Sequence, residues 1–138
     1  MRRHILMLED DTSRLSRFHD VLKPLGEVHT LHTWRDARQM VSEMSPFLGD
    51  CALICLDHDL EPEVAGHDPG DGLEVARFLA PLRLPIPILI HSSNGDAVQR
   101  MRGVLELEGW RVHSILPFGD RWVEQHWRQW VLQLTSAV

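Results

Sequence analysis

The sequence predicts an α/β fold, in which a doubly wound parallel sheet carries helices on both faces. Short apolar runs alternate with amphipathic helical segments five times along the chain, which is the pattern of successive βα units. The runs at residues 5–8 and 52–56 are apolar without interruption, as in strands buried on both faces. The chain has 138 residues, so we expect one domain over residues 1–138.

Each strand is predicted from an apolar run, and each helix from apolar residues spaced three or four apart behind a capping residue. The predicted strands cover residues 4–9, 28–31, 51–56, 86–90 and 112–116. The predicted helices begin at Thr12, at the capping-box-like pair Thr33 and Asp36, at Asp71, at Asn94-Gly95 and at Asp120, and the first ends at Pro24 and Gly26. One link, residues 57–72, is unusually long, and links of this length are usually functional or disordered.

The composition excludes several classes of function. The net charge is -6 and no basic block occurs, so we expect no broad nucleic-acid surface. This charge still allows the protein to bind a small phosphate ester through a metal ion. No apolar run approaches the length of a membrane span, and residues 5–8 are too short for a signal peptide. We therefore expect a cytoplasmic protein with no membrane contact, in which Cys51 and Cys55 are buried, reduced thiols.

Ten of the twenty carboxylates fall in two clusters, each placed directly after an apolar run. Glu9, Asp10 and Asp11 follow the first run, and Asp57 and Asp59 begin the second cluster. In an open α/β sheet the ligand site lies at the carboxyl ends of the strands. Because packed carboxylates repel one another unless a hard cation binds them, we predict a site for Mg²⁺, Mn²⁺ or Ca²⁺. Asp10 and Asp57 are its main candidate ligands, with Glu9, Asp11 and Asp59 next.

Five markers in order resemble the receiver domain of two-component response regulators over nearly the whole chain. They are the acids Glu9-Asp10-Asp11, the phosphoacceptor position Asp57, the pair Asp71-Gly72, the hydroxyl position Ser92, and Leu116-Pro117-Phe118 in place of Lys-Pro-Phe. The resemblance implies a flavodoxin-like (βα)₅ fold with strand order 2-1-3-4-5. It also implies a cis bond between Leu116 and Pro117.

Three features depart from an ordinary receiver: Leu116 replaces the lysine, His113 replaces a switch aromatic, and the link after Asp57 is long and acidic. Together they disfavour switching by phosphorylation. A narrower family within the receivers resembles this chain more closely. The strings LEDD, LDHDL, DG and HSSN, with Met101 and Gly109-Trp110, resemble the cyclic-phosphate processing receiver domain family. That resemblance implies metal-binding acids, no lysine, and action on a cyclic phosphate such as a cyclic nucleotide or an RNA end.

Two histidines adjoin the predicted site residues, and imidazole suits proton transfer to a leaving oxygen near neutral pH. The catalytic candidates are therefore Asp57, His58 and His91, with His91 favoured as the acid. Alternatively, each histidine is a strand-end residue bonded to backbone. Ser92 and Asn94 are candidates for phosphate binding, and the alternatives are a strand cap for Ser92 and a turn residue for Asn94.

Three functions are open at this point. The first is metal-dependent hydrolysis or processing of a phosphate ester, with a cyclic phosphate as the expected substrate. The second is a stand-alone response regulator phosphorylated on Asp57, and the third is a non-catalytic receiver that binds a partner. Trp122, Trp127 and Trp130 crowd the last predicted helix, where they favour a core or homodimer face over a platform for stacking bases.

Overall fold

Five parallel strands form one sheet in the order β2-β1-β3-β4-β5, which confirms the predicted fold class and strand order. The structure is a computed structural model, and it describes residues 2–25 and 28–135; Gly26, a predicted helix end, lies outside them. The strands are β1 (His4–Leu8), β2 (Thr30–Trp34), β3 (Cys51–Leu56), β4 (Ile88–His91) and β5 (Val112–Ile115). The helices are α1 (Thr12–Leu22), α2 (Ala37–Glu43), α3 (Gly72–Leu79), α4 (Gly95–Leu107) and α5 (Arg128–Thr135), with short turns η1 (Lys23–Leu25), η2 (Ser45–Asp50), η3 (Ala80–Leu82) and η4 (Val123–Trp127).

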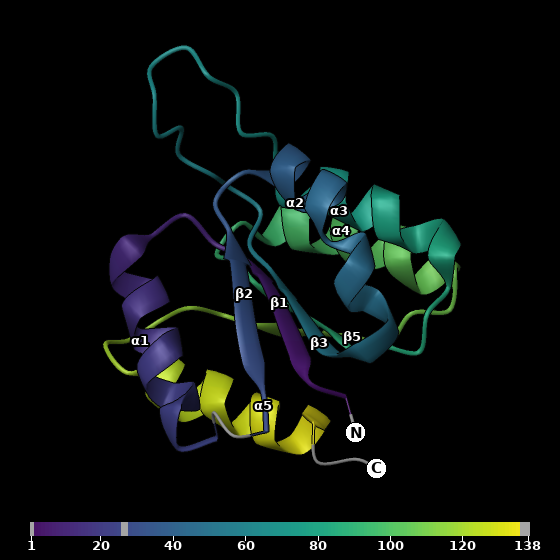
Figure 1. Ribbon diagram of the computed structural model, residues 1–138. Helices are drawn as coiled ribbons and strands as arrows, with labels where there is room; N and C mark the ends of the chain where they lie inside the picture. The colour runs from purple at the N-terminus through teal and green to yellow at the C-terminus, as the bar shows by residue number, and fades with distance from the viewer. Residues whose placement is uncertain (1, 26–27, 136–138) are drawn as a thin grey trace.

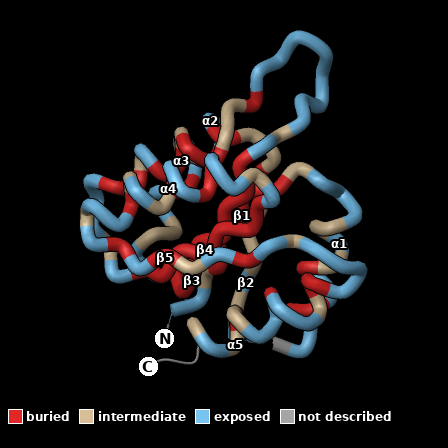
Figure 2. The backbone as a smooth tube through the Cα atoms, turned by 180° about the vertical axis from the view of Figure 1, so that it is seen from behind, coloured by how far each residue is buried: buried red, intermediate tan, exposed pale blue. Residues whose placement is uncertain are grey.

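Helices cover both faces of the sheet, with α2, α3 and α4 on one face and α1 and α5 on the other (Figure 1). Alternate residues of β1 and β3 point to opposite faces. Leu6 and Ile54 join the core under α2 to α4, whereas Ile5 and Leu53 join the core that contains Phe18 and Trp127. Figure 2 shows the buried strands at the centre of the molecule. In the described ranges, no helix is long and apolar enough to cross a membrane.

The structure corrects several predicted boundaries. Strand β2 begins at Thr30, two residues later than predicted, because this edge strand pairs in register with β1 from His4↔Thr30 to Leu8↔Trp34. Helix α1 is capped by Asp11, whose side chain accepts a hydrogen bond from the backbone of Arg14, so Thr12 is not the cap. Helix α2 is capped by Asp36 alone, since Thr33 lies within β2. The C-terminal helical segment begins with the π-helical turn η4, which has no side-chain cap, so the predicted cap at Asp120 is wrong.

The expected cis bond before Pro117 is wrong, because the described residues contain no cis peptide bond. The backbone N–H of Phe118 donates to the carbonyl oxygen of Leu116 at 2.8 Å. This hydrogen bond closes a three-residue turn around Pro117. The chain therefore bends after β5 with every peptide bond trans, and β5 completes the sheet beside β4.

The long link between β3 and α3 extends away from the body of the molecule (Figure 1) and has no regular secondary structure. Several contacts tie it to the body of the molecule. Its backbone N–H at Glu61 donates to Asp10, Glu63 pairs with Arg35, and His67 contacts Asp36. The first part of the link, at Asp59 and Glu61, thus forms a wall beside the carboxyl ends of β1 and β3.

Candidate functional site

The carboxyl ends of β1, β3 and β4 bring three predicted site residues together. Glu9 directly follows β1, Asp57 directly follows β3, and His91 is the last residue of β4. Because β3 pairs with both β1 and β4, the three side chains meet at one edge of the sheet. One potential ligand atom from each lies within 4.8 Å of the other two, and all three residues are buried.

The two carboxyl groups of this cluster cannot both ionise at low cost. Burial and the neighbouring Glu9 carboxylate raise the pKa of Asp57 to about 8. Burial also acts to raise the pKa of Glu9, but His91, Asp57 and Arg14 overcome it and hold that pKa at about 2. Each carboxylate thus opposes ionisation of the other, and a cation at this position would relieve the repulsion.

The donor set fits a divalent cation. Glu9 Oε2 accepts hydrogen bonds from the backbone N–H groups of Asp10 and Asp11, at 3.0 and 3.3 Å. Glu9 Oε1 and both ring nitrogens of His91 are buried and have no hydrogen-bond partner within the described residues. Unsatisfied buried polar atoms are rare, and carboxylate oxygens and imidazole nitrogens are ordinary metal ligands.

A hollow of about 470 Å³ opens above this buried cluster. Its lining residues are Asp10, Asp11, Thr12, Arg14, Asp57, Asp59, Glu61, Ser92 and Ser93. Asp10 Oδ2 accepts from the backbone N–H of Glu61, and burial raises the pKa of Asp10. Asp11 serves as the cap of α1. Of the predicted metal ligands, the structure places Glu9 and Asp57 in the buried cluster, and Asp10, Asp11 and Asp59 on the wall around it.

The two candidate histidines occupy different places. His58 lies between two carboxylates, with Nδ1 2.7 Å from Asp59 Oδ1 and Nε2 3.6 Å from Asp71 Oδ2. His91 is fully buried and has its Nε2 3.3 Å from Glu9 Oε1. Neither ring is part of the lining of the hollow in the described chain.

Gly72 allows the backbone of α3 to approach Asp57 closely. A Cβ atom at this position would lie 2.0 Å from the carbonyl oxygen of Asp57, which is not sterically allowed. The N–H of Gly72 donates to the carbonyl oxygen of His58 at 3.1 Å, and Asp71 caps α3 through the backbone N–H of Glu74. The pair Asp71-Gly72 therefore holds the start of α3 against the end of β3, next to the buried acid Asp57.

The two residues predicted to bind phosphate have local structural roles. Asn94 caps α4, since its Oδ1 accepts from the backbone N–H of Ala97, and its Nδ2 lies 3.4 Å from the carboxylate of Asp59. Ser92 Oγ accepts from the backbone N–H of Asn94 at 3.1 Å and also lines the hollow. Asn94 is therefore a helix cap and not the turn residue of its alternative, whereas Ser92 makes a local contact directly after β4; phosphate binding by both residues stays a prediction.

Sequence reasoning missed Arg14, which brings a cation to this acidic site. Its Nη1 lies 3.6 Å from Glu9 Oε1, and its guanidinium carbon lies 5.4 Å from the centre of the Trp122 ring. The signal was available, since Arg14 occupies the first turn of a helix that begins directly after the acids. Leu116, by contrast, is 62% exposed after β5 and brings no charge.

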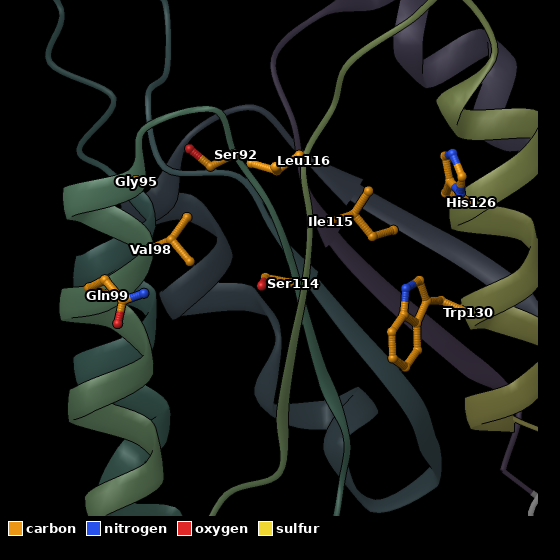
Figure 3. Close-up of a pocket in the computed structure, with 9 residues that line it drawn as sticks. All are labelled: Ser92, Gly95, Val98, Gln99, Ser114, Ile115, Leu116, His126 and Trp130. Atoms are coloured by element: carbon orange, nitrogen blue, oxygen red, sulfur yellow. The ribbon is translucent and has the colours of Figure 1, made fainter.

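A second hollow, of about 550 Å³, lies over the edge strand β5 between α4 and the C-terminal helix. Figure 3 shows Val98 and Gln99 entering it from α4, and Trp130 from α5. Ser92 lines both hollows, so the two adjoin at the end of β4. Of the three C-terminal tryptophans, Trp127 and Trp122 are buried, which leaves Trp130 as the one that lines this groove.

Solved receiver domains share this fold across their whole length. The phosphorylated cyanobacterial phytochrome response regulator RcpA has a TM-score of 0.70 at 17% identity, covering 99% of this chain and 96% of that chain. The Mn²⁺-bound form of response regulator Rcp1 has a TM-score of 0.66 at 20% identity, with coverages of 99% and 96%. The receiver domain of sensor histidine kinase PA1611 from Pseudomonas aeruginosa PAO1 was solved with a magnesium ion in its active-site cleft. It has a TM-score of 0.65 at 19% identity, covering 99% of this chain and 100% of that chain.

The fold, with acids at its carboxyl edge, is that of a receiver domain. Within that class, the sequence profile of the cyclic-phosphate processing receiver domain matches residues 5–107. The chain therefore belongs to the cyclic-phosphate processing receiver domain family. The match ends before β5, so the trans Leu116-Pro117 bond lies outside the matched residues. No protein of curated function has a sequence that matches this chain.

Proposed function

We propose that this domain hydrolyses a phosphate ester, and specifically a cyclic phosphate, in the acidic hollow. The observation that carries the proposal is that one hollow holds the buried acid Asp57 together with Arg14, Ser92 and Ser93. Phosphoryl transfer requires positive charge near the phosphoryl oxygens and a group that handles protons. The family assignment supports the cyclic substrate by its description alone.

The phosphate group is held by Arg14 and by the hydroxyl groups of Ser92 and Ser93. A guanidinium offers paired N–H donors whose geometry matches phosphate oxygens. Arg14 is free to turn toward the hollow, because its side chain is 30% exposed and its contact with Glu9 is long, at 3.6 Å. It thus supplies the positive charge that Leu116 cannot, from the opposite side of the site.

A divalent cation belongs beside Asp57, where Glu9 and His91 complete the buried cluster and Asp10 lines the wall. When bound there, such an ion supplies positive charge to the phosphoryl oxygens. The Mg²⁺ and Mn²⁺ in two of the solved receiver domains support a cation in this place.

Proton transfer is assigned to Asp59 and His58 acting as a pair. Asp59 is exposed on the wall of the hollow, and His58 Nδ1 lies 2.7 Å behind its carboxylate. Asp59 can take a proton from an attacking water and share it with His58 behind it, and the Asp59 carboxyl group can then return the proton to the leaving oxygen. His91, which the sequence favours as the acid, is less suited, since its ring is fully buried between Phe18 and Trp122.

The groove over β5 receives the organic group of the ester. It adjoins the acidic hollow through Ser92, and Val98, Ile115, Leu116 and Trp130 give it an apolar wall. Gln99 and Ser114 add polar groups to the same groove (Figure 3). A planar ring with polar edges, such as a nucleobase, matches that mixture of surfaces.

The test is a hydrolysis screen over 2′,3′- and 3′,5′-cyclic nucleotides with Mg²⁺ and Mn²⁺. We expect turnover by the wild-type protein, and a loss of about 10²- to 10⁴-fold in His58→Ala with little change in metal affinity. His19→Ala is the matched control, because His19 is an exposed histidine of α1 outside the site. If every cyclic phosphate is inert with both metals, or if His58→Ala and His19→Ala behave alike, the assigned chemistry is wrong.

A further inference from the structure

His91 is an unusual buried residue. It is the last residue of β4 and its side chain has no exposed surface. Neither Nδ1 nor Nε2 has a hydrogen-bond partner among residues 2–25 and 28–135. Polar side-chain atoms buried this deeply nearly always have a partner, so the structure leaves the role of this imidazole to be explained.

The ring is directed at the two buried carboxyl groups. His91 Nε2 lies 3.3 Å from Glu9 Oε1, an atom that also lacks a hydrogen bond within the described chain. Glu9, Asp57 and His91 each offer one ligand atom within 4.8 Å of the others. Ligand atoms that share one ion at bond lengths of about 2.0–2.3 Å can be separated by about 4–4.5 Å, so the trio is close to the spacing of a common ion.

Aromatic packing holds the ring in this orientation. Trp122 stacks on His91 with centroids 6.0 Å apart and planes at 28°, and Phe18 lies 5.6 Å away on the same side of the sheet. The packing presents one edge of the imidazole to the point where Glu9 and Asp57 meet.

We propose that His91 is a direct ligand of the divalent ion held by Glu9 and Asp57, and that the site consequently prefers Mn²⁺, Co²⁺ or Zn²⁺ to Mg²⁺. Mg²⁺ takes oxygen ligands almost exclusively, whereas imidazole nitrogen favours transition ions. A set of two carboxylates and one imidazole therefore shifts the selectivity of an otherwise all-oxygen site. The proposal concerns metal binding and holds whether or not the domain hydrolyses a cyclic phosphate.

The direct test is pulsed electron paramagnetic resonance of the Mn²⁺-loaded protein, which detects nitrogen bound to the ion. We expect a directly coordinated nitrogen in the wild type, its loss in His91→Gln, and its retention in His58→Gln. Titration calorimetry should show that His91→Gln weakens Mn²⁺ and Co²⁺ binding by at least about 10-fold. The affinity for Mg²⁺ should change by less than about 2-fold, since Mg²⁺ gains little from imidazole.

A second variant, His91→Leu, keeps the apolar contacts with Phe18 and Trp122 and removes both nitrogens. Circular dichroism of the metal-free variants shows whether they fold. If neither His91 variant folds, the wild-type and His58→Gln spectra decide the matter, because a bound nitrogen must appear in both. An ion bound without nitrogen in the wild type, or with nitrogen still present in a His91 variant, overturns the proposal. No Mn²⁺ or Co²⁺ binding by the wild type overturns it as well.

Discussion

At the scale of single residues, the site differs from an ordinary receiver in its basic side chains. It lacks the lysine after the fifth strand and has an arginine in the first helix instead. Leu116 is exposed after β5 where receivers carry lysine, and Arg14 reaches the acidic hollow from the first turn of α1. In the proposed function, the positive charge that meets the phosphoryl group comes from α1 instead of from the residue after β5. An anion bound here would therefore have open space toward β5, where the second hollow lies.

Arg14→Gln should lower kcat/KM for a cyclic phosphate by about 10²-fold, because one charged donor to the phosphoryl oxygens is lost. Metal affinity should not fall, since Arg14 is not a metal ligand and its loss removes a positive charge 3.6 Å from Glu9 Oε1. Steady-state kinetics and titration calorimetry measure the two effects. Arg83→Gln is the matched control, since Arg83 is an exposed arginine paired with Glu108. Equal kinetics in the two variants would remove Arg14 from the site.

One ion pair predicts a pH effect on stability. Arg17 donates two hydrogen bonds to Glu124, at 2.9 and 2.7 Å, and this lowers the pKa of Glu124 from 4.5 to about 2. The unfolded chain therefore takes up this proton at a higher pH than the folded chain, so the stabilisation is present above pH 4.5 and is lost as the pH falls toward about 2.

Over that window the wild type should lose more stability than Glu124→Gln, by up to about 1 kcal/mol, because the pair lies at the surface. Urea denaturation at several pH values measures the difference. Arg17→Gln should behave like Glu124→Gln, and the double variant should lose no more than either single one. Parallel pH profiles for wild type and Glu124→Gln would contradict the assigned cause.

At the scale of elements, the close approach of α3 to β3 positions the site. Gly72 opens α3 directly under the carbonyl group of Asp57. Gly72→Ala should destabilise the fold by about 1–3 kcal/mol, because the added Cβ atom forces the two backbones apart. Gly103→Ala in the middle of α4 is the matched control. It meets open space and should stabilise the protein by up to about 1 kcal/mol. Chemical denaturation distinguishes the two, and equal effects would contradict the packing argument.

The sequence predicts some elements well for a physical reason. Strand β3 is apolar throughout because both of its faces are buried, and its predicted bounds, 51–56, are those observed. Strand β2 lies at the edge of the sheet and is mostly half-exposed, so its sequence lacks such a run and its predicted bounds were displaced. The prediction that Thr12 caps α1 was wrong, because the preceding Asp11 is also a capping residue type, and only the backbone decides between them.

The candidate site was likewise predictable only in part. The acids were predicted, because their place after apolar runs puts them at the carboxyl ends of strands. Which of them would be buried was not predictable from spacing, since Glu9 turns inward toward His91 while Asp11 turns back to cap α1. Arg14 and His91 acquire their positions only through the packing of α1 and β4 against Trp122.

At the scale of the whole molecule, the fold collects its buried negative charge at one edge of the sheet. Burial and Glu9 keep the pKa of Asp57 high, because the ionised form of Asp57 is disfavoured beside Glu9. An ion that binds only the folded chain should stabilise it by about 2.7 kcal/mol when its concentration is 100 times Kd.

Thermal denaturation with and without Mn²⁺ measures this stabilisation. Asp57→Asn should abolish the gain and, in the presence of a chelator, should be at least as stable as the wild type, since the carboxylate repulsion is gone. Asp20→Asn, at an exposed position of α1, should keep the full gain. An equal gain in all three proteins would place the ion elsewhere.

The most direct test of the central claim compares wild type and Asp57→Asn in one assay that follows both possible fates of phosphate. Each protein is incubated with a cyclic phosphate and a divalent ion, and separately with acetyl phosphate, and ring opening and protein mass are recorded. We predict ion-dependent ring opening by the wild type, its loss in Asp57→Asn, and little stable phosphoryl adduct, because Leu116 cannot neutralise one. The account is contradicted if the wild-type protein leaves the cyclic phosphate intact and gains one phosphoryl group at Asp57 from acetyl phosphate.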